Sequence, residues 1–427
     1  FMLFSLFFGA GNLIFPPMFG MESGANFVAG ITGFILTAVL LPFLAVISIV
    51  LSNNGLLSIG QRVHPIFGLL FAISIYLSIG AFYGIPRASN VAYELGFMQV
   101  YNVEGQLTLL LFSAIFFGLT YMISLNPKKI INYVGHLLNP AFLVVLGILF
   151  VQAFLTFTYS ESSPSEKFQA APFLKGFLEG YFTMDAVAAL AFGIVIINGL
   201  KDKGITKKND LIRGTIYTGL IATGGLITVY LSLGWIGRVL PHDEPVENGA
   251  EILVRASQQL FGYGGNVLFG VIVILACITT CVGLITASSR FFNEIFPRFS
   301  YKRFVVIFTV IGMVFTNFGL NLILQVAKPL LIFIYPISIV LIMLSLFQFF
   351  FGESKKMYVF SVSIATLFAI YDVLNTLNIH FDILNSFLSY LPLYEDGLGW
   401  IGPTLIAATV GYAIDAKQKK VINYSKS

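Results

Sequence analysis

The sequence predicts an all-α integral membrane protein with twelve transmembrane helices. Hydrophobic residues make up 57% of its 427 residues and charged residues only 10%, against about 25% charged residues in an ordinary soluble domain. Uncharged apolar stretches recur along the whole chain, and a stretch of about 20 apolar residues is enough to cross a hydrocarbon core. The positive charges also gather in those segments that would lie on one side of the membrane.

The apolar stretches are expected to be helices. They are continuously apolar and rich in Leu, Ile and Phe, whereas the strands of a membrane barrel alternate apolar and polar residues over about ten positions. Their repetition excludes a cleaved signal peptide as the source of the hydrophobicity. The predicted spans are residues 2–20, 27–51, 65–93, 107–125, 131–158, 175–200, 211–236, 265–292, 303–318, 329–351, 357–377 and 398–414.

The distribution of Lys and Arg predicts that both termini are cytoplasmic. Segments on the cytoplasmic side of a membrane carry the excess of these residues. If the chain begins in the cytoplasm, most of its 24 Lys and Arg residues fall in inside segments. Two lie near spans, Arg87 and Lys328, and the outside segments hold Lys167, Lys175, Arg238 and Arg255.

The composition gives no indication of a catalytic, redox or nucleic-acid-binding centre. The net charge is only +4, and it arises from loops. The cysteines, Cys277 and Cys281, lie one helical turn apart in an apolar run, where they are expected to pack as small residues. The four histidines show no metal-ligand spacing. We therefore expect neither enzymatic activity nor a nucleic-acid partner.

Two predicted spans contain features that interrupt a membrane helix. The first holds Gly9-Ala10-Gly11-Asn12 followed by Pro16-Pro17, and such residues leave backbone groups unpaired unless a neighbour or ligand satisfies them. Close packing by small residues is the alternative. The sixth holds Asp185 between Gly180 and Gly193. An Asp at mid-bilayer costs at least about 2.5–3.5 kcal/mol, so it either pairs with a Lys or Arg of another span or lines a substrate or ion site.

The positions of these two spans indicate a secondary transporter. Spans 1 and 6 are five apart and would cross the membrane in opposite directions. Interrupted helices in corresponding positions of two inverted halves mark the substrate site of such transporters. A channel or a membrane-embedded enzyme is the competing class, and the sequence shows no membrane cluster of catalytic groups.

Four motifs carry a resemblance to a known family. The stretch from Phe4 to Pro17 resembles the start of bacterial branched-chain amino acid transporters of the BrnQ type, the LIVCS family. Further similarities are Pro86-Arg87-Ala88-Ser89 in span 3, Thr183-Met184-Asp185-Ala186 in span 6 and Ala276-Cys277-Ile278-Thr279-Thr280 in span 8. These motifs cover both halves of the chain.

The resemblance implies the fold of the amino acid–polyamine–organocation superfamily. This LeuT-type fold has five helices, an inverted repeat of five, and here two further helices. The repeats would occupy residues 1–158 and 159–351, and residues 352–427 would hold the additional spans and a cytoplasmic tail. The resemblance also implies a protein of the bacterial inner (cell) membrane that imports leucine, isoleucine and valine by alternating access, with Na+ as coupling ion and no covalent cofactor.

The two interrupted spans are expected to hold the substrate. Freed N–H groups and the helix end at residues 9–12 would face the substrate carboxylate, because a helix N-terminus carries partial positive charge. By similarity, residues 182–185 match the unwound segment of sodium-coupled LeuT-type transporters, where Asp185 is a departure that would accept the substrate ammonium or bind a cation. Tyr83 is a candidate for the carboxylate, and packing is its alternative. The predicted substrate-binding residues are Gly9, Ala10, Gly11, Asn12, Phe182, Thr183, Asp185 and Tyr83.

A sodium site is implied by the span-8 motif. The spacing of Ala276, Thr279 and Thr280 is similar to half of the superfamily's common sodium site, which main-chain carbonyls near Ser5 and Phe8 would complete. Hydrogen bonding of the threonines to their own helix is the alternative. Proton coupling or exchange, with Asp185 titrating, is the alternative to sodium symport. Arg87 is left open between an extracellular gate, a pair with Glu94 and the interface.

Overall fold

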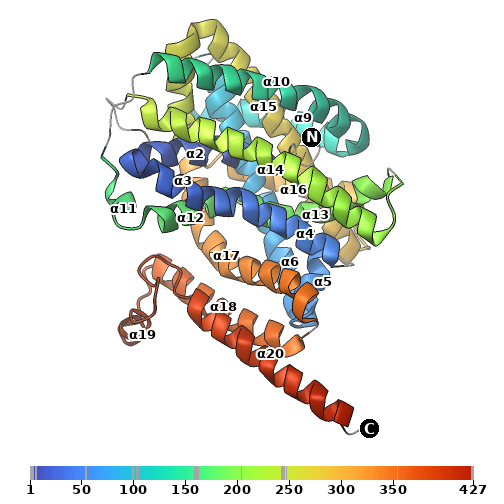
Figure 1. Cartoon of the computed structure of the whole chain (residues 1–427). Helices are drawn as coiled ribbons and strands as arrows, with labels where there is room; N and C mark the ends of the chain where they lie inside the picture. Colours follow the sequence, from blue (N-terminus) through green and yellow to red (C-terminus); the bar gives the residue numbers. More distant parts are fainter. Residues whose placement is uncertain are drawn as a thin grey trace. The chain divides into compact units, whose positions relative to one another are not determined.

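The computed structural model describes residues 4, 7–52, 55–98, 101, 103, 105–157, 163–202, 204–241, 246, 248–352 and 354–424. Within these ranges every regular element is helical (Figure 1). The elements are α2 (Ala10–Ser23), η1 (Gly24–Asn26), α3 (Phe27–Ile35), η2 (Leu36–Leu40), α4 (Leu41–Leu51), α5 (Gly55–Gln61), α6 (Pro65–Leu77), η3 (Ser78–Phe82), α7 (Gly84–Val91), η4 (Ala92–Met98), α9 (Gln106–Ser124), α10 (Pro127–Thr156), α11 (Glu166–Gln169), α12 (Pro172–Phe182), α13 (Asp185–Asp202), α14 (Lys208–Val239), α15 (Gly249–Ile295), α16 (Tyr301–Thr316), α17 (Leu320–Phe351), α18 (Lys355–Thr376), α19 (Asp382–Leu388) and α20 (Ile401–Tyr424).

Each predicted span overlaps a helix or a run of consecutive helices. In the described residues, seven helical segments are long and apolar enough to cross a membrane, and α12 with α13 would make an eighth. Part of the difference from twelve has simple causes. The segment Gly11–Leu51 takes in both of the first two predicted spans, and α16 has only 16 residues. The count of twelve crossings and the repeat boundaries stay predictions.

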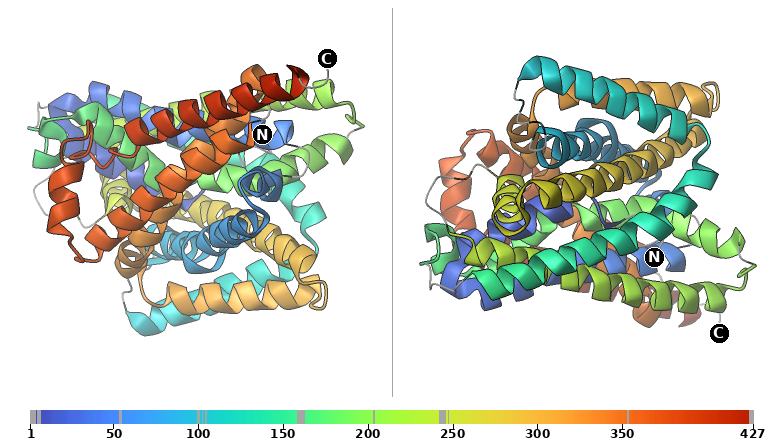
Figure 2. Two further views of the ribbon diagram at one scale, coloured as in Figure 1. Left: turned by 90° about the horizontal axis from the view of Figure 1, so that it is seen from below. Right: turned by 90° about the horizontal axis from the view of Figure 1, so that it is seen from above.

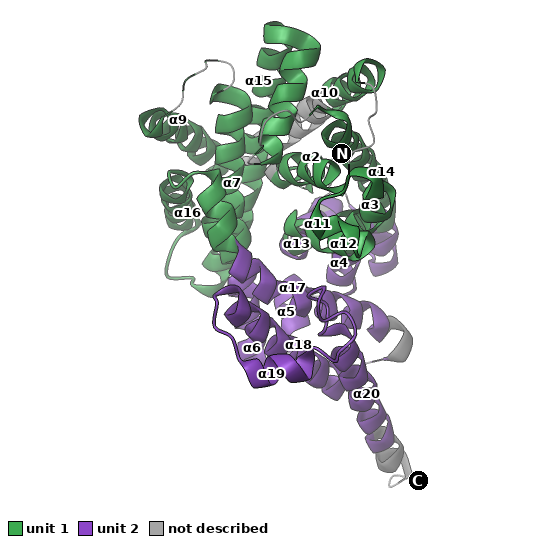
Figure 3. Cartoon of the chain, turned by 90° about the vertical axis from the view of Figure 1, so that its left-hand side faces the viewer, with its two compact units in different colours: residues 1–43, 76–188, 216–327 green, residues 44–75, 189–215, 328–427 purple. Residues whose placement is uncertain are grey.

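The chain forms two compact units (Figure 3). Unit 1 comprises Phe1–Phe43, Tyr76–Ala188 and Ile216–Ala327, and unit 2 comprises Leu44–Ile75, Ala189–Thr215 and Lys328–Ser427. All predicted site residues belong to unit 1. In unit 1, α9 lies beside α16 (Figure 2).

Glycines let α3 and α12 of unit 1 pack at backbone distance. A Cβ atom at Gly176 would lie 1.9 Å from the carbonyl oxygen of Gly30, and one at Gly33 would lie 2.0 Å from that of Phe173. The contact is reinforced because the Thr37 hydroxyl donates to the carbonyl of Phe177 at 2.6 Å. Any larger side chain at Gly176 or Gly33 would therefore push the helices apart.

Unit 2 contains a second close helix pair, α18 with α20. A Cβ atom at Gly411 would lie 2.6 Å from the carbonyl oxygen of Lys356. Asp415 of α20 accepts hydrogen bonds from the Ser354 hydroxyl at 2.8 Å and from the Lys356 amide at 2.9 Å, at the start of α18. A carboxylate is favourable at a helix N-terminus, so these bonds fix the ends of the pair.

Two glycines of α14 give a test of the packing around α2. A Cβ atom at Gly237 would lie 1.9 Å from the Pro17 carbonyl oxygen, whereas one at Gly224 would meet no atom within 4 Å. Overpacking typically costs about 1–3 kcal/mol. We expect Gly237→Ala to lower the apparent melting temperature of the detergent-solubilised protein, and the matched control Gly224→Ala to leave it unchanged or raise it. Equal melting temperatures for the two variants would contradict this packing.

Candidate functional site

The site is built around the break between α12 and α13. The two helices are bent by 43° relative to each other. Met184, between them, has a φ of 68°, in the left-handed region that residues other than glycine seldom adopt. The Thr183 hydroxyl turns back to the Gly180 carbonyl at 2.8 Å. The last carbonyls of a helix have no partner within it, so the end of α12 presents acceptors to other elements.

The start of α2 lies against this break. Gly9 is extended, with a φ of −142°, and its N–H donates to the Asn12 side-chain oxygen at 2.9 Å. A Cβ atom at Gly11 would lie 2.8 Å from the Thr183 carbonyl oxygen, so only glycine allows this approach. Ala10 is the first residue of α2, and its side chain lies outside the described part of the structure.

Asp185 is buried where the two elements meet, with 4% of its surface exposed. Its Oδ2 atom accepts a hydrogen bond from Asn12 Nδ2 at 3.1 Å and another from the Tyr230 hydroxyl of α14. Asn12 Nδ2 also lies within hydrogen-bond distance of the Tyr230 hydroxyl. A buried carboxylate needs such donors to replace the water that it has lost. The structure thus joins two predicted residues, Asn12 and Asp185, both directly and through Tyr230.

Arg87 of α7 reaches the same break from another side. It is 7% exposed, and its Nη2 atom donates to the Thr183 carbonyl at 3.2 Å and its Nη1 atom to the Tyr83 hydroxyl at 2.9 Å. Its guanidinium carbon lies 4.5 Å from the centre of the Tyr83 ring. Arg87 makes no ion pair with Glu94 or with any other carboxylate among the described residues. The pair with Glu94, one of the three roles left open for Arg87, is therefore not formed.

The residues of the predicted sodium site are partly brought together. The Thr280 hydroxyl of α15 lies 3.2 Å from the Phe8 carbonyl oxygen and 3.1 Å from the Ala276 carbonyl oxygen. The Thr279 hydroxyl instead donates to Leu275 of its own helix at 2.8 Å. Neutral oxygens of this kind suit a small hard cation. Ser5 lies outside the described residues.

Two aromatic residues complete the account of the predicted positions. The Phe182 carbonyl oxygen lies 3.5 Å from Arg87 Nη1, and the Phe182 ring lies 6.4 Å from the ring of Tyr181, between centroids. Tyr76, which a regular helix would place on the same face as Tyr83, stacks on Phe291 instead, at 4.0 Å. The roles of the predicted substrate and sodium ligands remain predictions.

Tyr230 could not be identified from the sequence. It is one of two tyrosines in α14, the other being Tyr217. No polar residue lies three or four positions from it, and only the tertiary structure places it against Asp185. Arg87 did give a signal, as a charged residue next to Pro86 in an apolar run. Its target was not evident, because the carbonyl groups that it contacts carry no sequence signature.

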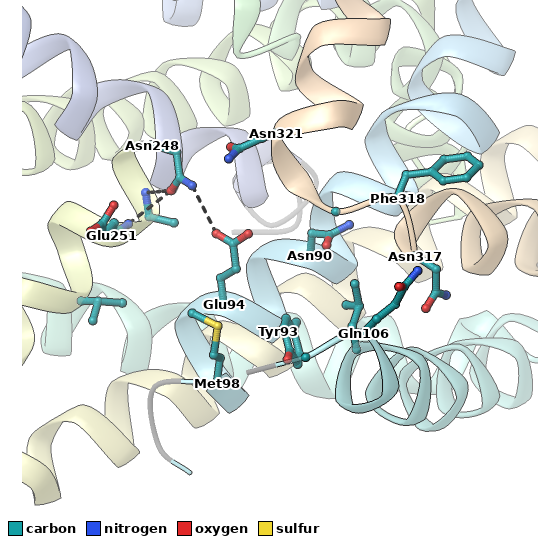
Figure 4. A pocket seen from close by; sticks show the side chains of 15 residues that line it. Asn90, Tyr93, Glu94, Met98, Gln106, Asn248, Glu251, Asn317, Phe318 and Asn321 are labelled. Atoms are coloured by element: carbon teal, nitrogen blue, oxygen red, sulfur yellow. Dashed lines mark hydrogen bonds between the residues drawn. The ribbon is translucent and has the colours of Figure 1, made fainter. Parts of the chain in front are cut away.

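A polar pocket of about 790 Å³ opens one helical turn beyond Arg87 on α7, where Asn90 lines it (Figure 4). Within the pocket Asn248 lies 3.5 Å from Glu94 and caps α15 by accepting from the amide of Ala250 at 3.0 Å. In the predicted topology these residues lie toward the extracellular ends of their helices. The volume is in the range of about 300–1,000 Å³ that small-molecule pockets have. The other polar residues that line it are Tyr93, Gln106, Glu251, Asn317 and Asn321.

Comparison of the sequence with known proteins gives consistent results. Residues 1–418 match a family described as "Branched-chain amino acid transport protein". The branched-chain amino acid permease BraB of Bacillus subtilis (strain 168) is 40% identical over 417 residues, covering 97% of this chain and 94% of that permease. The branched-chain amino acid permease BrnQ of Corynebacterium glutamicum is 40% identical over 425 residues, covering 100% of this chain and 96% of that permease.

Comparison of the structure with solved structures finds transporters of the LeuT fold, among them Mhp1 and MhsT. Mhp1, a nucleobase-cation-symport-1 family transporter, has a TM-score of 0.61 at 14% identity, over 96% of this chain and 90% of that one. MhsT, solved in complex with L-phenylalanine, has a TM-score of 0.58 at 16% identity, over 97% of this chain and 96% of that one. At these identities the likeness concerns the fold alone.

Proposed function

The chain belongs to the family of branched-chain amino acid transport proteins, which confirms the family that its motifs predicted, and we propose that it imports leucine, isoleucine and valine by sodium symport. Its relatives are permeases and transport proteins rather than enzymes, as predicted. The proposal goes further than the family in its substrates, in its coupling ion and in the direction of transport.

The proposed transporter works by alternating access in the bacterial inner membrane. It has twelve spans and two inverted repeats, lies in the lipid bilayer and keeps both termini in the cytoplasm. The bias of Lys and Arg toward the segments predicted inside supports this orientation. The fold shared with Mhp1 and MhsT supports the repeat arrangement, because in such folds the substrate site lies at interrupted helices near the midplane.

The observation that carries the proposal is the buried Asp185 between the start of α2 and the break after α12. A carboxylate held by Asn12 and Tyr230 is placed to accept the ammonium group of an amino acid. The cluster of the Phe8 and Ala276 carbonyls with the Thr280 hydroxyl supports a sodium ion close by. Asn12, which contacts Asp185, and Phe8, which contacts Thr280, both lie around the start of α2. Binding of the amino acid and binding of the sodium ion would therefore be coupled through this segment.

A proton-coupled transporter or exchanger is the second candidate. The observation that favours it is that the Tyr230 hydroxyl and the Asn12 amide both touch one oxygen of Asp185. A carboxyl group in such surroundings can hold or release a proton while its partners stay in place. In that case Asp185 would titrate during the cycle and no sodium site would be needed.

The test is uptake of labelled leucine by proteoliposomes that contain only this protein. We expect accumulation when sodium is higher outside, and its loss when choline replaces sodium at constant pH. Accumulation that persists in choline would contradict sodium coupling, and accumulation driven by a pH gradient without sodium would establish the alternative. Protein-free liposomes are the control. Failure to take up leucine, isoleucine or valine under any gradient would overturn the proposed function.

A further inference from the structure

We propose that the guanidinium of Arg87 binds the carboxylate of the amino acid substrate. With Asp185 at the ammonium, the chain would then hold both ends of the zwitterion by fixed side-chain charges. This inference rests on the proposed function and deepens it, because it names the group that selects substrates with a free carboxylate.

The first argument is the burial of Arg87 without an anionic partner. The side chain is 7% exposed, and it forms no ion pair with a carboxylate of the described residues. Its partners are the hydroxyl of Tyr83 and the main-chain carbonyls of Phe182 and Thr183. Removing an ion from water is expensive, and uncharged acceptors replace only part of the lost hydration. An anion that enters the site would supply the missing charge.

The second argument is which hydrogen atoms of Arg87 remain available. A guanidinium has five N–H donors. Nη1 contacts Tyr83 and Phe182, Nη2 donates to Thr183 only, and Nε is buried and has no partner among the described residues. Nε and Nη2 lie on one edge of the guanidinium plane, and this edge forms paired hydrogen bonds with a carboxylate. The unused donors of Arg87 thus lie on the edge of the guanidinium that a substrate carboxylate would contact.

The third argument is the position of Arg87 relative to Asp185. Arg87 donates to Thr183, two residues before Asp185. A Cβ atom at Gly11 would lie 2.7 Å from Arg87 Nη2, and the next residue, Asn12, donates to Asp185. The two charges therefore flank the same stretch of α2 without pairing with each other. An α-amino acid carries its own two charges one carbon apart, so two opposite charges beside one stretch of backbone are complementary to it.

The fourth argument concerns the competing donors at α2. The N–H of Gly9 is already bonded to the Asn12 side chain at 2.9 Å, so it does not remain free for a carboxylate. The rings of Tyr83 and Phe15 lie 4.5 Å and 5.8 Å from the Arg87 guanidinium carbon. Aromatic faces attract guanidinium groups and restrict their orientation. Arg87 is thereby the charged donor that the site holds in a fixed orientation.

The experiment compares leucine with leucinamide, which keeps the side chain and the ammonium but lacks a charged carboxylate. Dissociation constants are measured on the purified protein and on Arg87→Gln. We expect the unsubstituted protein to prefer leucine by at least about 30-fold, and Arg87→Gln to lose most of this preference, since removing one partner of a buried charge pair weakens binding strongly. Binding of leucinamide should change by less than about threefold. Arg87→Lys should be intermediate, because it keeps the charge but cannot form two parallel bonds.

Arg62→Gln is the matched control. Arg62 donates to the Tyr358 hydroxyl at 2.7 Å and lies 5.5 Å from the centre of that ring, so it resembles the Arg87–Tyr83 pair but belongs to unit 2. The substitution Arg62→Gln should leave the preference for leucine over leucinamide unchanged. If Arg87 only holds the end of α12 in place, Arg87→Gln will weaken leucine and leucinamide equally, and that result would overturn the inference.

Two further outcomes separate this inference from the proposed function. An unsubstituted protein that binds no branched-chain amino acid would overturn both. If Arg87→Gln still binds leucine and still prefers leucine to leucinamide, the inference is overturned but the proposed function is not. If Arg87→Gln does not fold, a structure of the unsubstituted protein with leucine decides. We expect the carboxylate at hydrogen-bond distance from Nε and Nη2, and a carboxylate held by main-chain groups away from Arg87 would overturn the inference.

Discussion

Replacing Asp185 with asparagine is expected to weaken leucine binding by about 1,000-fold, since loss of one member of a buried charge pair costs up to about 5 kcal/mol. Asparagine has nearly the same shape, and its side-chain oxygen can still accept from Asn12 and Tyr230, which hold Asp185 now. The local structure should therefore persist while the negative charge disappears. Equilibrium binding of labelled leucine to the purified variant measures the effect without any dependence on the coupling ion.

The control for this experiment is Asp372→Asn. Asp372 is a carboxylate of α18 in unit 2, so its replacement removes a charge of the same kind from a membrane helix outside the site. Leucine binding should be unchanged. An Asp185→Asn protein that binds leucine within about threefold of the unsubstituted protein would show that the ammonium lies elsewhere. A variant that keeps sodium-driven uptake but loses proton-driven uptake would instead support the titrating role.

Replacing Thr280 with valine is expected to raise the sodium concentration for half-maximal leucine uptake by about 100-fold, since even groups that only support metal ligands are typically worth 10- to 100-fold in affinity. Valine matches threonine in shape but removes the hydroxyl that lies near the carbonyls of Phe8 and Ala276. Leucine uptake is measured in proteoliposomes over a range of sodium concentrations, with choline keeping the ionic strength constant.

Thr309→Val is the matched control for that substitution. Thr309 is a buried threonine of α16 whose hydroxyl donates to Val305 of its own helix at 2.7 Å, so its replacement removes a hydroxyl with no connection to the site. Sodium dependence should not change. Thr279→Val provides a second comparison with Thr280→Val, from the neighbouring position on the same helix. The Thr279 hydroxyl donates to the Leu275 carbonyl of its own helix. Unchanged sodium dependence in Thr280→Val would refute the sodium site at this position.

Hydropathy is sufficient to locate the helices, because the energy of a membrane span depends on composition more than on exact partners. The sequence also draws attention to Asp185, since a carboxylate flanked by glycines is costly in an unbroken apolar helix, and Asp185 begins α13 after the 43° bend from α12. The inverted positions of spans 1 and 6 predict that Asn12 and Asp185 belong to one site. Their side chains are in contact in the folded protein, at 3.1 Å.

Local irregularities of the backbone could not be predicted in the same way. Tyr76 and Tyr83 are seven residues apart and would share one face of a regular helix, but the π-helical segment η3 lies between them and Gly80 within it has a ψ of −106°. An added residue in a turn rotates everything beyond it, so the two tyrosines face different neighbours. Met184 is similar, because methionine gives no indication of a positive φ. Such features depend on tertiary packing, which a single sequence does not display.

The close approach of α3 and α12 constrains how the site can open. Backbone atoms of Gly30 and Gly176 leave no room for even a methyl group between the helices, so they cannot slide past each other without losing the contact. A displacement of α12 that keeps this contact would therefore carry α3 with it. The bend at Met184 is where α12 is joined to α13, and it would act as the hinge. Access to the bound amino acid would then be governed by rotation about one residue, with the helix pair as the moving arm.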